Sequence, residues 1–108
     1  MPIRINFEDI EWKDPPRGYY ISDVKQKTLW VNEETGATWV LMKWPPGLLD
    51  KKHTHPKANQ LALAMTGPNV GKMVSITKKG EPHGGSVVEE EMLVLFYWDG
   101  PPDPEVVE

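Results

Sequence analysis

The chain has 108 residues, with 12 basic and 16 acidic side chains and a formal net charge of −4, and this length fits one small domain. Hydrophobic residues make up 39% of the sequence and charged residues 26%, a composition that indicates neither a disordered chain nor a membrane protein. The absence of cysteine excludes disulfides, thiolate metal sites and cysteine nucleophiles, and the dispersed basic residues leave no positive face for nucleic acid.

The two ends of the chain carry further information. The first residues show no basic segment followed by a long apolar run, so we expect a cytoplasmic protein without a membrane partner. We treat residues 1–108 as a single domain because no repeat and no linker-like stretch divides them. Residues 99–108 are proline-rich and predict an extended tail that lies across the domain or is partly disordered.

Short β-branched and aromatic segments, separated by strong turn signals, predict an all-β fold. Residues 27–31 and 37–44 flank a polar loop and predict a hairpin, which ends at Pro45 and Pro46 because proline has no N–H to donate to a ladder. Three further strands are predicted at residues 61–65, 73–76 and 90–98. No segment shows a helical stripe of apolar residues.

The alternation of residues 37–44 divides the second predicted strand into two faces. Trp39 and Leu41 share one face, and Val40 and Met42 share the other. One pair should line the interior, but the sequence does not say which. The five tryptophans are expected to be core and interface residues, with a ligand cage as the alternative.

The histidines form the most specific pattern in the sequence. His53 and His55 are separated by one residue, and residues two apart in a strand point to the same face. His83 lies between Pro82 and Gly84, which can hold one side chain in a set direction. Three neutral imidazoles on a rigid scaffold suit a divalent first-row metal and leave its opposite side open. The same spacing also fits a solvated pair and a surface histidine.

This spacing resembles the first motif of the cupin superfamily, which runs glycine, five residues, His-x-His, three or four residues, glutamate, six residues and glycine. Every spacing is present here, with glutamine in place of glutamate: Gly47, His53, His55, Gln60 and Gly67. The resemblance covers about residues 27–101. It implies a small, single-domain, jelly-roll-like β-barrel, similar to β-diketone-cleaving dioxygenases and to the cupin domains of zinc-binding anti-sigma factors.

The second cupin motif is matched only in part. Gly80 and His83 keep its spacing, whereas Lys78 stands where proline is usual and Val87 where asparagine is usual. Only residues 68–71 separate the two motif regions, so about a hairpin is missing compared with the family. We therefore expect a barrel that is open on one side or completed by a partner subunit.

The resemblance implies a divalent metal held by His53, His55 and His83. Gln60 in place of glutamate resembles the three-histidine cupins, and its amide oxygen is either a weak fourth ligand or an ordinary buried amide. The leading hypothesis is a non-haem Fe(II) dioxygenase that acts on a small anionic dicarbonyl or enolate, because neutral ligands leave the metal its full positive charge. Zinc, manganese and nickel are the alternative metals, and no further catalytic residue is indicated.

Two other hypotheses stay open. The first is a non-catalytic zinc-dependent binding or sensor cupin, since Zn²⁺ outcompetes Fe²⁺ for nitrogen ligands. The second is a sugar-binding or isomerase cupin, in which the histidines would act as acid and base. In every case we expect a small-molecule ligand and a homodimer, because the resemblance implies a dimer and a short open barrel has apolar surface to cover.

Overall fold

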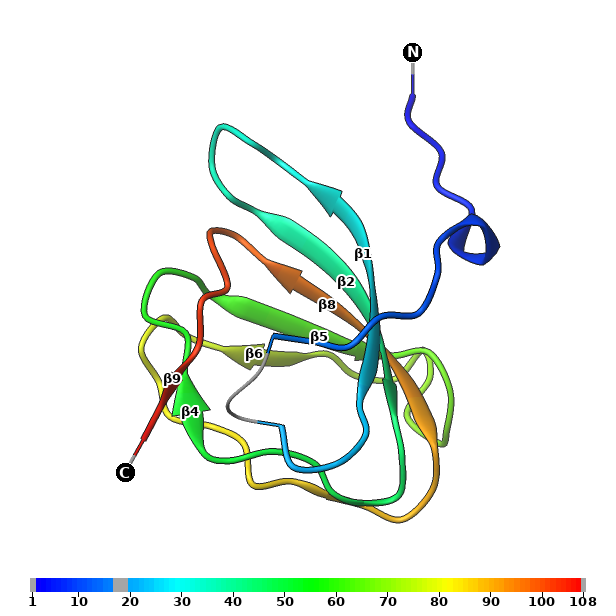
Figure 1. The fold of residues 1–108 in the computed structure, drawn as a ribbon, viewed down its shortest axis with the longest axis vertical. Coiled ribbons are helices and arrows are strands. Elements are labelled where there is room, and N and C mark those ends of the chain that lie inside the picture. The colour runs from blue at the N-terminus through cyan, green and yellow to red at the C-terminus, as the bar shows by residue number, and fades with distance from the viewer. Residues whose placement is uncertain (1, 17–19, 108) are drawn as a thin grey trace.

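A computed structural model describes residues 2–16 and 20–107, and its strands confirm the predicted all-β architecture (Figure 1). The main element is an antiparallel sheet of five strands in the order β1-β2-β8-β5-β6. Its members are β1 (Lys25–Val31), β2 (Thr38–Trp44), β8 (Met92–Trp98), β5 (Gln60–Ala64) and β6 (Ser75–Thr77). Two smaller sheets pair β3 (Gly47–Leu48) with β7 (Val87–Val88), and β4 (His53–Thr54) with β9 (Glu105–Val106). The one helical turn within the described residues is the 3₁₀ segment η1 (Phe7–Asp9).

The predicted hairpin is confirmed, with small shifts at its ends. β2 stops at Trp44, directly before the two prolines. β1 begins two residues earlier than expected because Lys25 and Gln26 still pair with Lys43 and Met42. At the other end of the sheet, β6 begins at residue 75 instead of 73, since turns occupy residues 68–72.

The proline-rich tail lies across the domain, which is one of its two expected outcomes. β9 lies beside β4 (Figure 1), and in this pairing Val106 stands opposite His53. The backbone N–H of Val107 also donates to the carbonyl of Lys52 at 3.0 Å. The tail therefore holds the short strand that carries the first histidine.

The inner face of the large sheet carries the hydrophobic core. Val40 and Met42 belong to the core cluster and point inward, with 3% and 1% of their surface exposed. Trp39 and Leu41 lie on the outer face, where Trp39 is 38% exposed and Leu41 is 4% exposed. The structure thus shows which face of β2 lines the interior, which the sequence left open. The core draws on the sheet and on the segments that cover it: Val24, Val40, Met42, Leu49, Ala58, Val94, Phe96 and Trp98.

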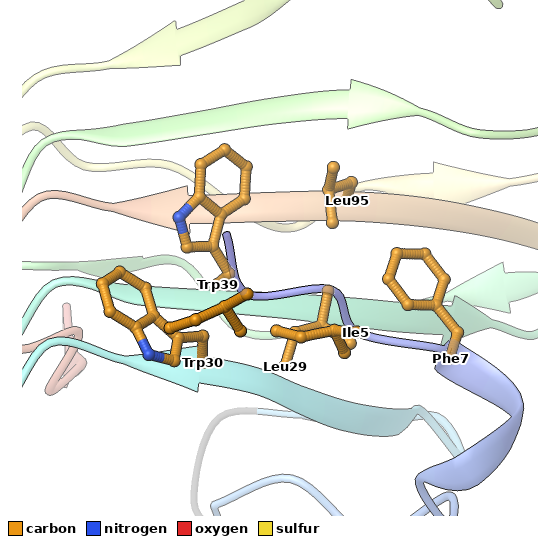
Figure 2. A pocket seen from close by; sticks show the side chains of 7 residues that line it. Ile5, Phe7, Leu29, Trp30, Trp39 and Leu95 are labelled. Atoms are coloured by element: carbon orange, nitrogen blue, oxygen red, sulfur yellow. The ribbon is translucent and has the colours of Figure 1, made fainter. Parts of the chain in front are cut away.

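The outer face of the sheet carries an apolar groove of about 530 Å³, which we call the outer groove (Figure 2). A β-bulge between Thr28 and Trp30 places both Leu29 and Trp30 on this face. The N-terminal segment forms one wall and is held there by Lys27, whose Nζ donates to the carbonyl of Phe7 at 2.7 Å. The groove is lined by Ile3, Ile5, Phe7, Leu29, Trp30, Trp39 and Leu95.

The large sheet is open, with β1 and β6 as its two edges. The described strands form three separate sheets, and the completion of the barrel by a partner subunit stays a prediction. Across residues 2–16 and 20–107, no helix is long and apolar enough to cross a bilayer. The cytoplasmic location and the domain bounds of 1–108 stay predictions.

Candidate metal centre

The three histidines lie together at the inner side of the large sheet. Their ring centroids are 4.3 to 5.0 Å apart, and one nitrogen from each ring lies within 4.8 Å of the other two. His53 belongs to β4, His55 follows it directly, and His83 comes from the turn between β6 and β7. The structure thus brings together the residues that the motif spacing singled out.

Backbone hydrogen bonds hold the two histidine segments side by side. The N–H of His53 donates to the carbonyl of His83 at 2.8 Å, and the N–H of His83 donates back to the carbonyl of His53 at 2.9 Å. The N–H of Gly80 donates to the carbonyl of His55 at 3.1 Å. The relative position of the imidazoles is therefore set by main-chain pairing between segments about 30 residues apart.

Gly84 is required for this close approach. Its φ of +107° lies in a region that residues with a Cβ rarely adopt. A Cβ at this position would lie 2.8 Å from the carbonyl oxygen of Lys51 and 3.0 Å from Nδ1 of His53. The absence of a side chain at Gly84 thus leaves room for the His53 ring.

Each imidazole is oriented by a backbone carbonyl. Nδ1 of His53 lies 2.7 Å from the carbonyl oxygen of Lys51, and Nδ1 of His55 lies 2.7 Å from that of Pro102. Nδ1 of His83 lies 3.1 Å from the carbonyl oxygen of Glu81. Because a carbonyl oxygen only accepts, each neutral ring carries its proton on Nδ1 and has its lone pair on Nε2. Such hydrogen bonds commonly orient metal-binding histidines.

Burial favours the neutral form of the first two histidines. His53 and His55 each expose 3% of their surface. Desolvation lowers the pKa of His53, and it lowers the pKa of His55 from 6.5 to about 4. The neutral imidazole, which is the form that binds a metal, therefore dominates at neutral pH.

The donor set fits a divalent metal. Nε2 of His83 is buried and has no hydrogen-bond partner among the described residues, so its lone pair is free to bind. In an octahedral or tetrahedral site with metal–nitrogen bonds of about 2.1 Å, ligand nitrogens lie about 3.0 to 3.4 Å apart. The nitrogens here all lie within 4.8 Å of one another, so metal binding would draw the three rings closer together.

Gln60 is also brought to this region, in a different role. It lies at the start of β5 and is buried, and its Oε1 accepts a hydrogen bond from Nε1 of Trp98 at 3.0 Å. The Trp98 ring lies 5.5 Å from the His55 ring. The amide oxygen thus already orients an indole beside the histidines, and a role as weak fourth ligand stays a prediction.

The histidines line a cavity of about 220 Å³, which we call the inner cavity. Its walls include Trp44, which sequence analysis considered only in the alternative of a tryptophan ligand cage. They also include side chains that sequence analysis did not assign to a site, namely Tyr20, Asp50, Ser75, Thr77 and Ser86. Alternation along β2 places Trp44 on the same face as Met42. The position of Trp44 could therefore be predicted from the sequence once the inner face of β2 was known. The others come from loops and from the edge strand, for which no motif exists.

Comparison with known proteins identifies the fold. No family model and no curated protein matches the sequence. Among solved structures, a candidate acetylacetone dioxygenase from Methylibium petroleiphilum PM1 is similar at a TM-score of 0.74 and 13% identity, over 100% of this chain and 82% of the other. The DMSP lyase DddQ from Ruegeria pomeroyi DSS-3 is similar at 0.71 and 17% identity, over 93% and 62% of the two chains.

A third similar structure carries the fold in its name. It is a cupin-like protein from Thermotoga maritima msb8, with a TM-score of 0.54 and 20% identity over 87% of this chain and 83% of the other. The similar proteins differ in their described activities, so the likeness concerns architecture. The chain has the cupin fold.

Proposed function

We propose that the protein binds one divalent metal ion through Nε2 of His53, His55 and His83. The single observation that carries this proposal is the shared tautomer, since all three Nδ1 atoms face backbone carbonyls and all three lone pairs are left on Nε2. Fe(II) is the proposed metal, and zinc, manganese and nickel are the alternatives. Gln60 is included as a weak fourth ligand.

We further propose that the bound metal serves a dioxygenase reaction on a small anionic dicarbonyl or enolate. Three neutral ligands would leave the metal its full positive charge, and Fe(II) would supply the redox chemistry when bound. The inner cavity supports a small substrate, because about 220 Å³ is the volume of about seven water molecules. The similarity to a candidate acetylacetone dioxygenase supports the same substrate class.

The protein's own groups would bind and orient this substrate. Phe96 and Trp98 form an apolar wall of the inner cavity, with their rings stacked at 5.3 Å, and this wall limits the access of water. The carbonyls behind the imidazoles fix the directions in which the ligand nitrogens point. These features would prepare a partly dry site with one side open to ligand.

Metal analysis tests this proposal and separates it from the alternatives. Protein purified without an affinity tag should contain nearly stoichiometric iron, and His83→Ala should lose both the metal and the oxygen-dependent consumption of dicarbonyl compounds. Zinc in the native protein, with no turnover after iron replacement, would favour the binding or sensor role. A metal-free protein with full activity on a sugar would favour the isomerase role and overturn the metal proposal.

We also propose that the protein is a homodimer and that the outer groove lies in its interface. Trp30 and Trp39 expose 44% and 38% of their surface on this face, and Ile3 exposes 71% beside them. A contiguous apolar surface of this kind is typical of a protein interface. Light scattering during size exclusion should give twice the mass of the 12.3 kDa chain, and a monomer at micromolar concentration would contradict the proposal.

A further inference from the structure

Trp44 has an unusual position in the inner cavity. It is the last residue of β2 and lies on the inner face, with its ring 5.8 Å from that of Phe96. Its Nε1 is buried and has no hydrogen-bond partner within the described residues. By contrast, the indole N–H of Trp98 in the same cavity donates to Gln60. An indole N–H is a donor only, and a buried donor without an acceptor is unfavourable for folding.

The second unpaired group in the structure lies in the same cavity. Within residues 2–16 and 20–107, only Trp44 Nε1 and His83 Nε2 are buried side-chain nitrogen or oxygen atoms without a partner. Both residues line the inner cavity. One is a hydrogen-bond donor and the other carries a lone pair for the proposed metal. Buried polar groups without a partner call for an explanation, and a partner that arrives with a ligand in this cavity would supply one.

We propose that Trp44 Nε1 donates a hydrogen bond to an oxygen of the bound ligand and selects ligands with two acceptor oxygens. This inference rests on the proposed function, in which the metal takes one or both oxygens of the ligand. Trp44 is thus a binding and specificity residue. The contact uses a neutral donor, and a hydrogen bond is electrostatically stronger inside a protein than in water.

The rest of the cavity wall agrees with such a ligand. Two hydroxyl residues of the edge strand β6 line the same cavity. Ser75 pairs with Ala62, and Thr77 pairs with Gln60. The volume of the cavity, which equals that of about seven water molecules, suits a small ligand. A five-carbon compound with two carbonyl oxygens is therefore a suitable probe, and its one-carbonyl analogue is a matched control.

The test compares pentane-2,4-dione with pentan-2-one on zinc-loaded protein, so that no turnover is needed. Calorimetry should show that Trp44→Phe weakens binding of the dione by about threefold to tenfold while changing binding of the monoketone by less than twofold. Trp12→Phe is the matched control, because Trp12 lines neither the inner cavity nor the outer groove, and it should change neither. Zinc affinity should be the same in all three proteins.

A second measurement uses the unmodified protein. In a ¹⁵N-resolved spectrum, the indole N–H signal that is absent from Trp44→Phe should move on addition of the dione and stay in place with the monoketone. Equal dione affinity in the wild type and Trp44→Phe, or an unmoved indole signal, with zinc binding intact, would overturn this inference alone. A wild-type protein that binds no metal would overturn the proposed function as well.

Discussion

The two faces of the large sheet have very different surroundings. The inner face packs Val40, Met42 and Phe96 against the segments that carry the histidines. The outer face carries lysines, among them Lys27 and Lys43, as well as apolar residues, and its Trp30 and Trp39 remain about two-fifths exposed. In an antiparallel sheet with one solvated face, polar residues would alternate with apolar ones. The outer face, which the N-terminal segment covers only in part, thus exposes more apolar surface than such a face requires, in keeping with the proposed dimer interface.

The largest expected effect concerns the ligands of the inner cavity. His53→Ala should remove the metal completely at micromolar concentration, because loss of an orienting partner alone typically costs about 10-fold to 100-fold in affinity and loss of a ligand costs more. Metal content after dialysis measures this. Lys51→Ala is the matched control, since it keeps the backbone carbonyl that faces His53. Stoichiometric metal in His53→Ala would refute its role.

Acid should lower the free energy of unfolding of the metal-free protein. His55 has a pKa of about 4 in the folded chain and about 6.5 when unfolded, so the unfolded chain binds more protons between these values. Stability should therefore fall as pH drops from about 6.5 to about 4, by roughly 3 kcal/mol from this residue. Urea unfolding at several pH values measures it. In His55→Gln the free energy of unfolding should depend less steeply on pH between these values. An unchanged pH dependence would contradict the lowered pKa of His55.

A pair of neighbouring glycines tests the packing around His53. Gly84→Ala should cost at least about 1 kcal/mol more than Gly85→Ala, because both have positive φ but only the first Cβ meets His53 and Lys51. A Cβ at Gly85 has nothing within 4 Å. Urea unfolding and metal affinity should both separate the two variants. Equal effects would show that backbone strain alone matters there.

A single charged substitution tests whether the outer face forms the dimer interface. Trp30→Lys should weaken self-association by about tenfold or more, since a buried lysine lacks a partner and tryptophan is a common interface anchor. Ile21→Lys is the control, because Ile21 is 54% exposed and lies outside the outer groove. Sedimentation over a range of concentrations measures the association constant. Equal dimer strength in both variants would place the interface elsewhere.

The smallest effect is expected at Gln60. Gln60→Met removes the amide oxygen at similar volume and should reduce metal affinity by less than about threefold, because this oxygen already accepts from Trp98. A competition titration with a chelator measures the change. A hundredfold loss would make Gln60 a full ligand.

Much of the fold could be predicted from local sequence. The turn at Pro45 and Pro46 ends β2 as expected, and the aromatic run before Asp99 forms the predicted β8. Proline and alternation act over a few residues, so their effect is visible without the rest of the chain. The starts of β1, β6 and β8 were missed by two residues, since strand ends depend on the partner strand.

The sequence by itself determined which histidines meet, because the spacing of His53, His55 and His83 matches a known pattern and glycine and proline shape the turn around the third. Tertiary structure alone decided that Val40 and Met42 face inward, and that the carbonyl of Pro102, 47 residues away, orients His55. It also decided that the indole N–H of Trp44 is left without a partner. The physical reason is that residue type and spacing act locally, whereas burial and hydrogen-bond pairing depend on which distant segments pack together.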